Sequence, residues 1–169
     1  WSNAVDWVND DYFDAVMNYA YFKDPVMRFF NNRQCDAKAF DRDLKQGLLS
    51  YPVQATQVMM NLIDSHDTFR FLESCNGDIK RLELAVLFQM TYVGTPHIWY
   101  GDEIGMMGGH DPDCRRPFNW LYEQNEKNRD WSNSKRSAIT HHALCNKNQR
   151  YKTEYNDVPG GYICKKPNH

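Results

Sequence analysis

Residues 56–68 read Thr-Gln-Val-Met-Met-Asn-Leu-Ile-Asp-Ser-His-Asp-Thr, an apolar run that is followed at once by a polar turn. Residues 56–63 carry apolar side chains on both parities, which is typical of a strand in a parallel sheet covered on both faces. In parallel α/β folds, ligands bind at the carboxyl ends of the strands. The polar turn at residues 64–68 is therefore the first place to look for a functional site.

Two helical segments flank this strand. Residues 39–49 are amphipathic at helical spacing, and residues 78–90 form the clearest helix, because Asp78 can cap its amino terminus. The side chains expected to face the core are Phe40, Leu44, Leu48 and Leu49 in the first segment, and Leu82, Leu84, Ala85, Leu87 and Phe88 in the second.

Further strands and a helix complete the pattern. Residues 12–19 and residues 97–100 are short, mostly apolar runs that predict strands. A helix is expected to open at Asp24 and Pro25, since proline suits the first helical turn. The alternation of strands and helices with short connections predicts βα units around a parallel sheet. Residues 131–169 have few aliphatic side chains and give no helical pattern, so residues 1–130 are expected to form the folded part and residues 131–169 an irregular tail.

Composition limits the class of protein. The 169 residues are 41% hydrophobic and 25% charged, with a formal net charge of −2, so no basic field for nucleic acid is expected. No apolar run is long enough to span a bilayer, and no membrane association is expected. Five scattered cysteines favour free thiols in a reducing compartment, and hence a cytoplasmic protein.

The first cluster of chemically useful side chains is Asp64, His66, Asp67 and Arg70, at the end of the predicted strand. A carboxylate beside an imidazole can stabilise developing positive charge and hydrogen-bond a polar substrate. A buried aspartate near Arg70 is expected to stay ionised, because an opposite charge favours the charged form. The alternative is structural, with Asp67 or Thr68 capping the following turn.

The second cluster is Asp111, Asp113, Arg115 and Arg116, in a glycine-rich loop at residues 101–120. Alternating aspartate and arginine can grip sugar hydroxyls through charge-assisted hydrogen bonds. An internal ion-pair network that holds the loop together is the alternative.

Other chemistries find weaker support. A zinc site at His110 and Cys114, or at residues 141–145, lacks the usual ligand spacing, so no metal is expected. The chain has no Gly-x-Ser-x-Gly nucleophile motif, and its glycine-rich loop lacks the lysine of a phosphate-binding loop. No cofactor is expected.

Four stretches, in order along the chain, resemble the α-amylase family of glycoside hydrolases. Residues 61–68 (Asn-Leu-Ile-Asp-Ser-His-Asp-Thr) resemble the family's last conserved region, and residues 95–106 resemble its eighth strand and exit. Residues 108–120 and 13–19 are similar to a loop and a sixth strand of the neopullulanase, cyclomaltodextrinase and maltogenic amylase group. The resemblance runs from position 1 to about position 129.

This resemblance implies a partial (β/α)8 TIM barrel, containing its last three βα units, with the active site at the strand ends. Asp67 matches the aspartate that stabilises the oxocarbenium-like transition state of a retaining enzyme. His66 matches the histidine that binds the same sugar, while Asp111 and Arg115 match a pair that binds the non-reducing side of the substrate. Trp1 matches a tryptophan near the leaving-group sugar.

The same resemblance implies an α-glucan hydrolase that cleaves α-1,4 and also α-1,6 bonds in cyclodextrins, pullulan or maltooligosaccharides. In the family order, the nucleophilic aspartate and the acid/base glutamate both precede position 1, so the isolated chain is expected to be inactive. A 4-α-glucanotransferase and a non-catalytic sugar-binding relative are the alternatives. The resemblance also allows a homodimeric full-length parent.

Overall fold

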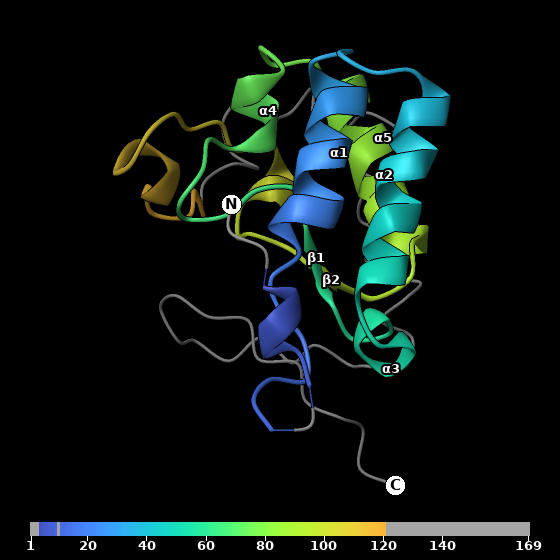
Figure 1. Ribbon diagram of the computed structural model, residues 1–169. Helices are drawn as coiled ribbons and strands as arrows, with labels where there is room; N and C mark the ends of the chain where they lie inside the picture. The colour runs from blue at the N-terminus through green and yellow to red at the C-terminus, as the bar shows by residue number, and fades with distance from the viewer. Residues whose placement is uncertain (1–3, 10, 121–169) are drawn as a thin grey trace, which may run out of the picture.

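The computed structural model describes residues 4–9 and 11–120, which form a mixed α/β unit (Figure 1). Both the predicted tail at residues 131–169 and Trp1 lie outside the described residues. The elements, in chain order, are η1 (Val5–Trp7), η2 (Tyr19–Lys23), α1 (Asp24–Val26), η3 (Met27–Asn31), α2 (Ala37–Ser50), α3 (Val53–Thr56), β1 (Met60–Leu62), α4 (Phe71–Ser74), α5 (Ile79–Thr91), β2 (Thr95–His97), η4 (Asp102–Ile104) and η5 (Asp113–Arg115).

The two strands pair in parallel, as the alternating pattern predicts. Met60 lies opposite Thr95 in this register, and Leu62 lies opposite His97. A third extended segment joins β1 on its other edge through a parallel bridge at Met17. All three segments run in the same direction, so their carboxyl ends meet at one edge of the sheet.

The strands are shorter than predicted. The strand expected at residues 56–63 covers only Met60–Leu62, because Thr56 belongs to helix α3, where its amide donates to the carbonyl oxygen of Pro52. The strand expected at residues 97–100 lies two to three residues earlier, at Thr95–His97. Pairing in a parallel sheet, and not the run of apolar letters, determines where each strand ends.

The prediction of a strand at residues 12–19 is wrong. Only Phe13 and Met17 make isolated bridges, and Tyr19 begins a helix. That helix starts earlier than the expected opening at Asp24, because η2, α1 and η3 follow one another without a break. Its π-type turns use bonds over five residues, for example from the Lys23 amide to the Asn18 oxygen at 3.0 Å.

Helices α2 and α5 confirm the two predicted helical segments, and Asp78 caps α5 through bonds from the amides of Lys80 and Arg81. The expectation of burial is wrong for four of the apolar side chains. Leu48 and Leu49 of α2 are 37% and 87% exposed, and Leu84 and Leu87 of α5 are 53% and 47% exposed. The buried face of α5 instead carries Leu82, Ala85, Val86, Gln89 and Met90.

The core lies where helices α1, α2, α4 and α5 pack together beside the sheet (Figure 1). Phenylalanine rings fill it: Phe29 stacks on Phe40 with ring centroids 4.5 Å apart, and Phe22 stacks on Phe88 at 5.7 Å. Ile63, directly after β1, joins the same cluster. This packing anchors the end of β1, so the polar turn that follows starts from a rigid position. Within the described part of the chain, no helix is long and apolar enough to cross a bilayer.

Candidate active site

The turn after β1 is held by hydrogen bonds among its own residues and one from a helix. The Ser65 amide donates to the Thr68 hydroxyl at 3.0 Å, and the Asp67 amide donates to the Ser65 hydroxyl oxygen at 3.2 Å. The Tyr19 hydroxyl bonds to Ser65 Oγ at 2.9 Å. These bonds fix the backbone on both sides of His66 and therefore limit where the Asp67 carboxylate can lie.

Four of the side chains predicted from sequence meet at this turn. Asp67 Oδ1 lies 3.2 Å from His66 Nε2 and 3.5 Å from Arg115 Nη2. Arg115 Nε lies 2.9 Å from Asp111 Oδ1. Each of these side chains is about half exposed, so the group is open to a ligand while its members constrain one another.

The loop that carries Asp111 and Arg115 also bonds to the backbone of the turn. The His66 carbonyl oxygen accepts bonds from Arg115 Nε at 3.0 Å and from the buried Cys114 thiol at 3.2 Å. Residues that are nearly fifty positions apart in sequence therefore form one surface. The sequence pattern alone did not predict this contact between the two clusters.

The structural alternatives are also partly realised, by other residues than expected. The helix that follows the turn is capped by Asp64, whose Oδ2 accepts from the Phe71 amide at 2.7 Å. Thr68 closes its own turn by accepting from the Ser65 amide, and not the following turn, whereas the Asp67 side chain pairs with His66 and Arg115. The expected ion pairs within the loop exist too, because Arg116 Nε lies 3.0 Å from Asp113 Oδ1.

Beneath the turn lies a buried group of charges: Asp64, Arg70 and Asp102. Arg70 Nη1 is 3.4 Å from Asp102 Oδ1. Burial raises the pKa of Asp64 more than the Arg70 charge lowers it, so the net shift is opposite to the one that the arginine alone would produce. Burial and the neighbouring Asp64 raise the pKa of Asp102 well above its usual range. Asp64 and Asp102 each affect the pKa of the other, so the two buried carboxyl groups titrate as a pair.

Trp99 and Tyr100, which lie two and three residues after the end of β2, are site residues that the sequence pattern missed. Their rings lie close to Arg70, and the Trp99 ring is 5.7 Å from the His66 ring. The sequence pattern assigned both to a short strand at residues 97–100, so they drew no functional interpretation. Two aromatic residues at the carboxyl end of a short strand are the signal that could have identified them.

The two residues considered for zinc are used otherwise. His110 packs edge-on against the Phe69 ring at 4.3 Å, and the Cys114 thiol bonds to the His66 carbonyl. Within residues 4–9 and 11–120, no three His, Cys, Asp or Glu side chains are near enough to share a metal ion. Residues 141–145 lie outside the described residues.

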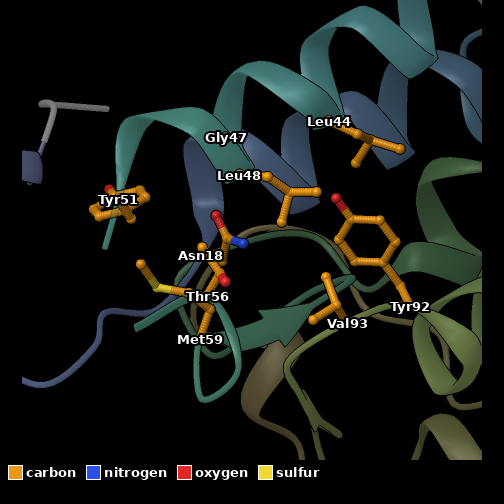
Figure 2. A pocket seen from close by; sticks show the side chains of 9 residues that line it. All are labelled: Asn18, Leu44, Gly47, Leu48, Tyr51, Thr56, Met59, Tyr92 and Val93. Carbon is orange, nitrogen blue, oxygen red and sulfur yellow. The ribbon is translucent and has the colours of Figure 1, made fainter. Parts of the chain in front are cut away.

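A small cavity lies at the opposite end of the strands. Figure 2 shows the side chains that line it, including Leu44 and Gly47 of α2, Met59 just before β1, and Tyr92 just after α5. Its volume is about 10 Å³, which is room for about one water molecule. This cavity is too small to bind a substrate.

Comparison with known proteins places this site in a family. Residues 2–160 match the family model described as "Alpha amylase, catalytic domain". The curated Neopullulanase 2 of Thermoactinomyces vulgaris is 54% identical over 129 residues, which cover 76% of this chain and 22% of that protein. The chain therefore spans about a fifth of the length of this relative.

Solved structures agree with this match. A cyclomaltodextrinase structure has a TM-score of 0.74 and 39% sequence identity, covering 89% of this chain and 26% of the other. The cyclic α-maltosyl-(1→6)-maltose hydrolase of Arthrobacter globiformis, in complex with that cyclic sugar, has a TM-score of 0.70 and 30% identity, covering 82% of this chain and 30% of the other. The similarity thus extends from sequence to backbone geometry.

Proposed function

Since this chain belongs to the α-amylase family of catalytic domains, we propose that it supplies the last three βα units of a (β/α)8 barrel in a retaining α-glucan hydrolase. The observation that carries the proposal is the convergence of Asp67, His66, Asp111 and Arg115 on one open surface after the parallel strands. In such barrels, catalytic groups come from the carboxyl ends of several strands.

Asp67 acts in the transition state. When the glycosidic bond breaks, positive charge develops on the sugar ring, and a fixed carboxylate nearby stabilises that charge without having to reorganise. The His66 contact and the bond from the Asp67 amide to Ser65 Oγ keep the Asp67 carboxylate in place. Asp67 also accepts hydrogen bonds from ring hydroxyls of the sugar at the cleavage site.

The remaining side chains bind sugar. His66 hydrogen-bonds the ring at the cleavage site, and the Asp111–Arg115 pair holds the sugar on the non-reducing side. A carboxylate accepts hydrogen bonds from hydroxyls and a guanidinium donates to oxygens, so this pair can bind a sugar hydroxyl both as donor and as acceptor. Trp1 contributes near the leaving-group sugar.

The nucleophilic aspartate and the acid/base glutamate of the reaction come from chain that precedes position 1. The substrates are α-1,4-linked and also α-1,6-linked glucans, such as maltooligosaccharides, cyclodextrins or pullulan. The full-length protein is cytoplasmic, which agrees with the free thiols of Cys35, Cys75 and Cys114.

The test is to assay the full-length protein that carries this chain on pullulan, β-cyclodextrin and maltotriose, following the anomeric configuration of the first product by NMR. Retained α configuration is expected, together with no turnover by the purified 169-residue chain alone. Inverted product, turnover by the 169-residue chain alone, or no turnover of any of these glucans by the full-length protein, would contradict the proposal. Longer products in place of free reducing sugar would point to glucanotransferase activity.

A further inference from the structure

Two aromatic side chains hold the main chain on either side of Arg115. Trp99 Nε1 donates to the Cys114 carbonyl oxygen at 3.3 Å, and the Tyr100 hydroxyl donates to the Arg116 carbonyl oxygen at 2.8 Å. Cys114 and Arg116 are the residues immediately before and after Arg115. The peptide units that orient the Arg115 side chain are therefore clamped by Trp99 and Tyr100.

Arg70 contacts both of these aromatic residues. Its fully buried guanidinium donates from Nη1 to the Tyr100 carbonyl oxygen at 2.7 Å, and its Cζ lies 5.0 Å from the Tyr100 ring centroid and 5.9 Å from the Trp99 ring. Its backbone amide donates to the Gly108 carbonyl oxygen at 2.9 Å, at the start of the same loop. Arg70 thus connects the turn that carries Asp67 to the loop that carries Arg115.

We propose that Trp99, Tyr100 and Arg70 are positioning residues that set the affinity of the Asp111–Arg115 pair for a glucosyl ring without contacting the sugar. This inference rests on the proposed function and extends it to a second set of side chains. Arg115 is about half exposed and lies on a loop, so its position before binding depends on how firmly the adjacent peptide units are held.

The physical reason is the cost of ordering. A long side chain on a loose loop loses conformational freedom when it binds a ligand, which weakens binding. A loop that is already clamped has lost that freedom before the sugar arrives. Because Arg115 and Asp111 bind the substrate away from the bond that breaks, this effect should raise KM and leave kcat nearly unchanged.

The test compares Tyr100→Phe with Tyr92→Phe in the full-length protein, both of which remove one hydroxyl group. Tyr100 bonds to the loop, whereas Tyr92 lies at the cavity on the far end of the strands (Figure 2). We expect Tyr100→Phe to raise KM for maltotriose by about 3- to 10-fold, the effect of one lost hydrogen bond, with kcat within about 2-fold. Tyr92→Phe should leave both constants unchanged.

A second measurement needs no substrate. Trypsin cleaves after arginine, and the bond between Arg115 and Arg116 lies on the exposed loop. Tyr100→Phe and Trp99→Phe should each speed cleavage at this bond by about 3- to 10-fold relative to Tyr92→Phe, because each loses one bond that holds the loop. Arg70→Met should speed it further, and Arg70→Lys should restore part of the protection.

The outcomes separate the two proposals. If the unmodified full-length protein turns over α-glucan but Tyr100→Phe and Tyr92→Phe have equal KM values and equal cleavage rates, the positioning role is wrong and the proposed function stands. If the unmodified protein turns over no glucan, the proposed function fails. A fall in kcat at constant KM for Tyr100→Phe would also overturn the positioning role, because it would indicate a contribution confined to the transition state.

Discussion

The two ends of the short parallel sheet differ in almost every physical respect. At the carboxyl end, β1 and β2 lead into polar segments whose charged side chains are about half exposed and pair across long stretches of sequence, as Asp67 and Arg115 do. At the amino end, Leu44, Met59 and Tyr51 are buried around a cavity of about 10 Å³ (Figure 2). One end is open and charged, and the other is closed and mostly apolar.

This difference indicates that one end of the sheet stabilises the fold and the other end carries the chemistry. The closed end removes apolar surface from water, which stabilises the fold. The open end leaves charges where a ligand can reach them and supports them with a buried layer of Asp64, Arg70 and Asp102. Parallel barrels in general carry stability at the amino end and chemistry at the carboxyl end, so substitutions at the two ends should have separable effects.

The largest effect on stability is expected at the closed end. Leu44→Ala removes a buried side chain beside the cavity and should lower the free energy of unfolding by about 2–5 kcal/mol, since a leucine-to-alanine change in a packed core leaves a void. The matched control is Leu49→Ala in the same helix, where the side chain is 87% exposed. Urea unfolding of both variants measures the difference, and equal losses would contradict this picture of the closed end.

The largest effect on activity is expected at the open end. Asp67→Asn should lower kcat by at least about 100-fold, because it removes a charge that acts in the transition state. Thermal unfolding should change little, since this carboxylate is about half exposed. Asp41→Asn, an equally simple change at an exposed ion pair on α2, is the control and should retain full turnover. Near-normal kcat in Asp67→Asn would show that Asp67 does not act in the reaction.

A smaller effect on stability is expected where α5 leads into β2. Gly94 has a φ of +111°, and an added Cβ would lie 2.6 Å from Asn61 Nδ2 and 2.9 Å from the Met59 carbonyl oxygen. Gly94→Ala should therefore destabilise by about 1–3 kcal/mol. Gly77→Ala is the control, since Gly77 also has a positive φ but has nothing within 4 Å of the added Cβ. Urea unfolding should show that Gly94→Ala costs more than Gly77→Ala, and equal costs would assign the effect to backbone strain alone.

The smallest effect concerns pH and the buried carboxyl pair. Burial raises the pKa values of Asp64 and Asp102 in the folded state above the ordinary value of 3.8. A raised pKa stabilises the fold fully below that ordinary value, and the contribution is lost as pH rises through the raised value. Asp102→Asn removes one of the two titrating groups. We therefore expect the native protein to lose stability relative to Asp102→Asn as pH rises above 4, measured by urea unfolding. A constant difference as pH rises would show that Asp102 does not titrate with a raised pKa.

Much of the fold follows from local pattern. Residues 79–91 alternate apolar and charged side chains at helical spacing after a capping aspartate, and the structure confirms that helix. The parallel sheet also agrees with prediction, because residues 56–63 are apolar on both parities and β1 lies among them. Strand ends were misplaced because a strand ends where its pairing ends, and apolar letters continue beyond that point, as they do through Trp99 and Tyr100.

The buried faces were harder to predict. Leu84 and Leu87 fit a helical stripe on α5 by spacing alone, yet they are about half exposed, while Gln89 is buried and donates to the carbonyl oxygens of Asn61 and His97. Hydrophobicity ranks which side chains gain from burial, but neighbouring elements decide which face of a helix is covered. A buried glutamine is acceptable here because its donors find backbone partners.

The candidate site shows the same division. The family and the list of side chains follow from local sequence, because residues 61–68 and 108–120 carry distinctive residue types in a distinctive order. Three other features became visible only in the folded chain: Arg115 meets Asp67, Asp64 caps a helix beneath the turn, and Trp99 and Tyr100 clamp the loop. The Asp67–Arg115 pair joins residues 48 positions apart, and the bonds from Trp99 and Tyr100 span 15 and 16 positions. These contacts form only after the sheet and helices have packed, because that packing sets their geometry and no local pattern of residues contains it.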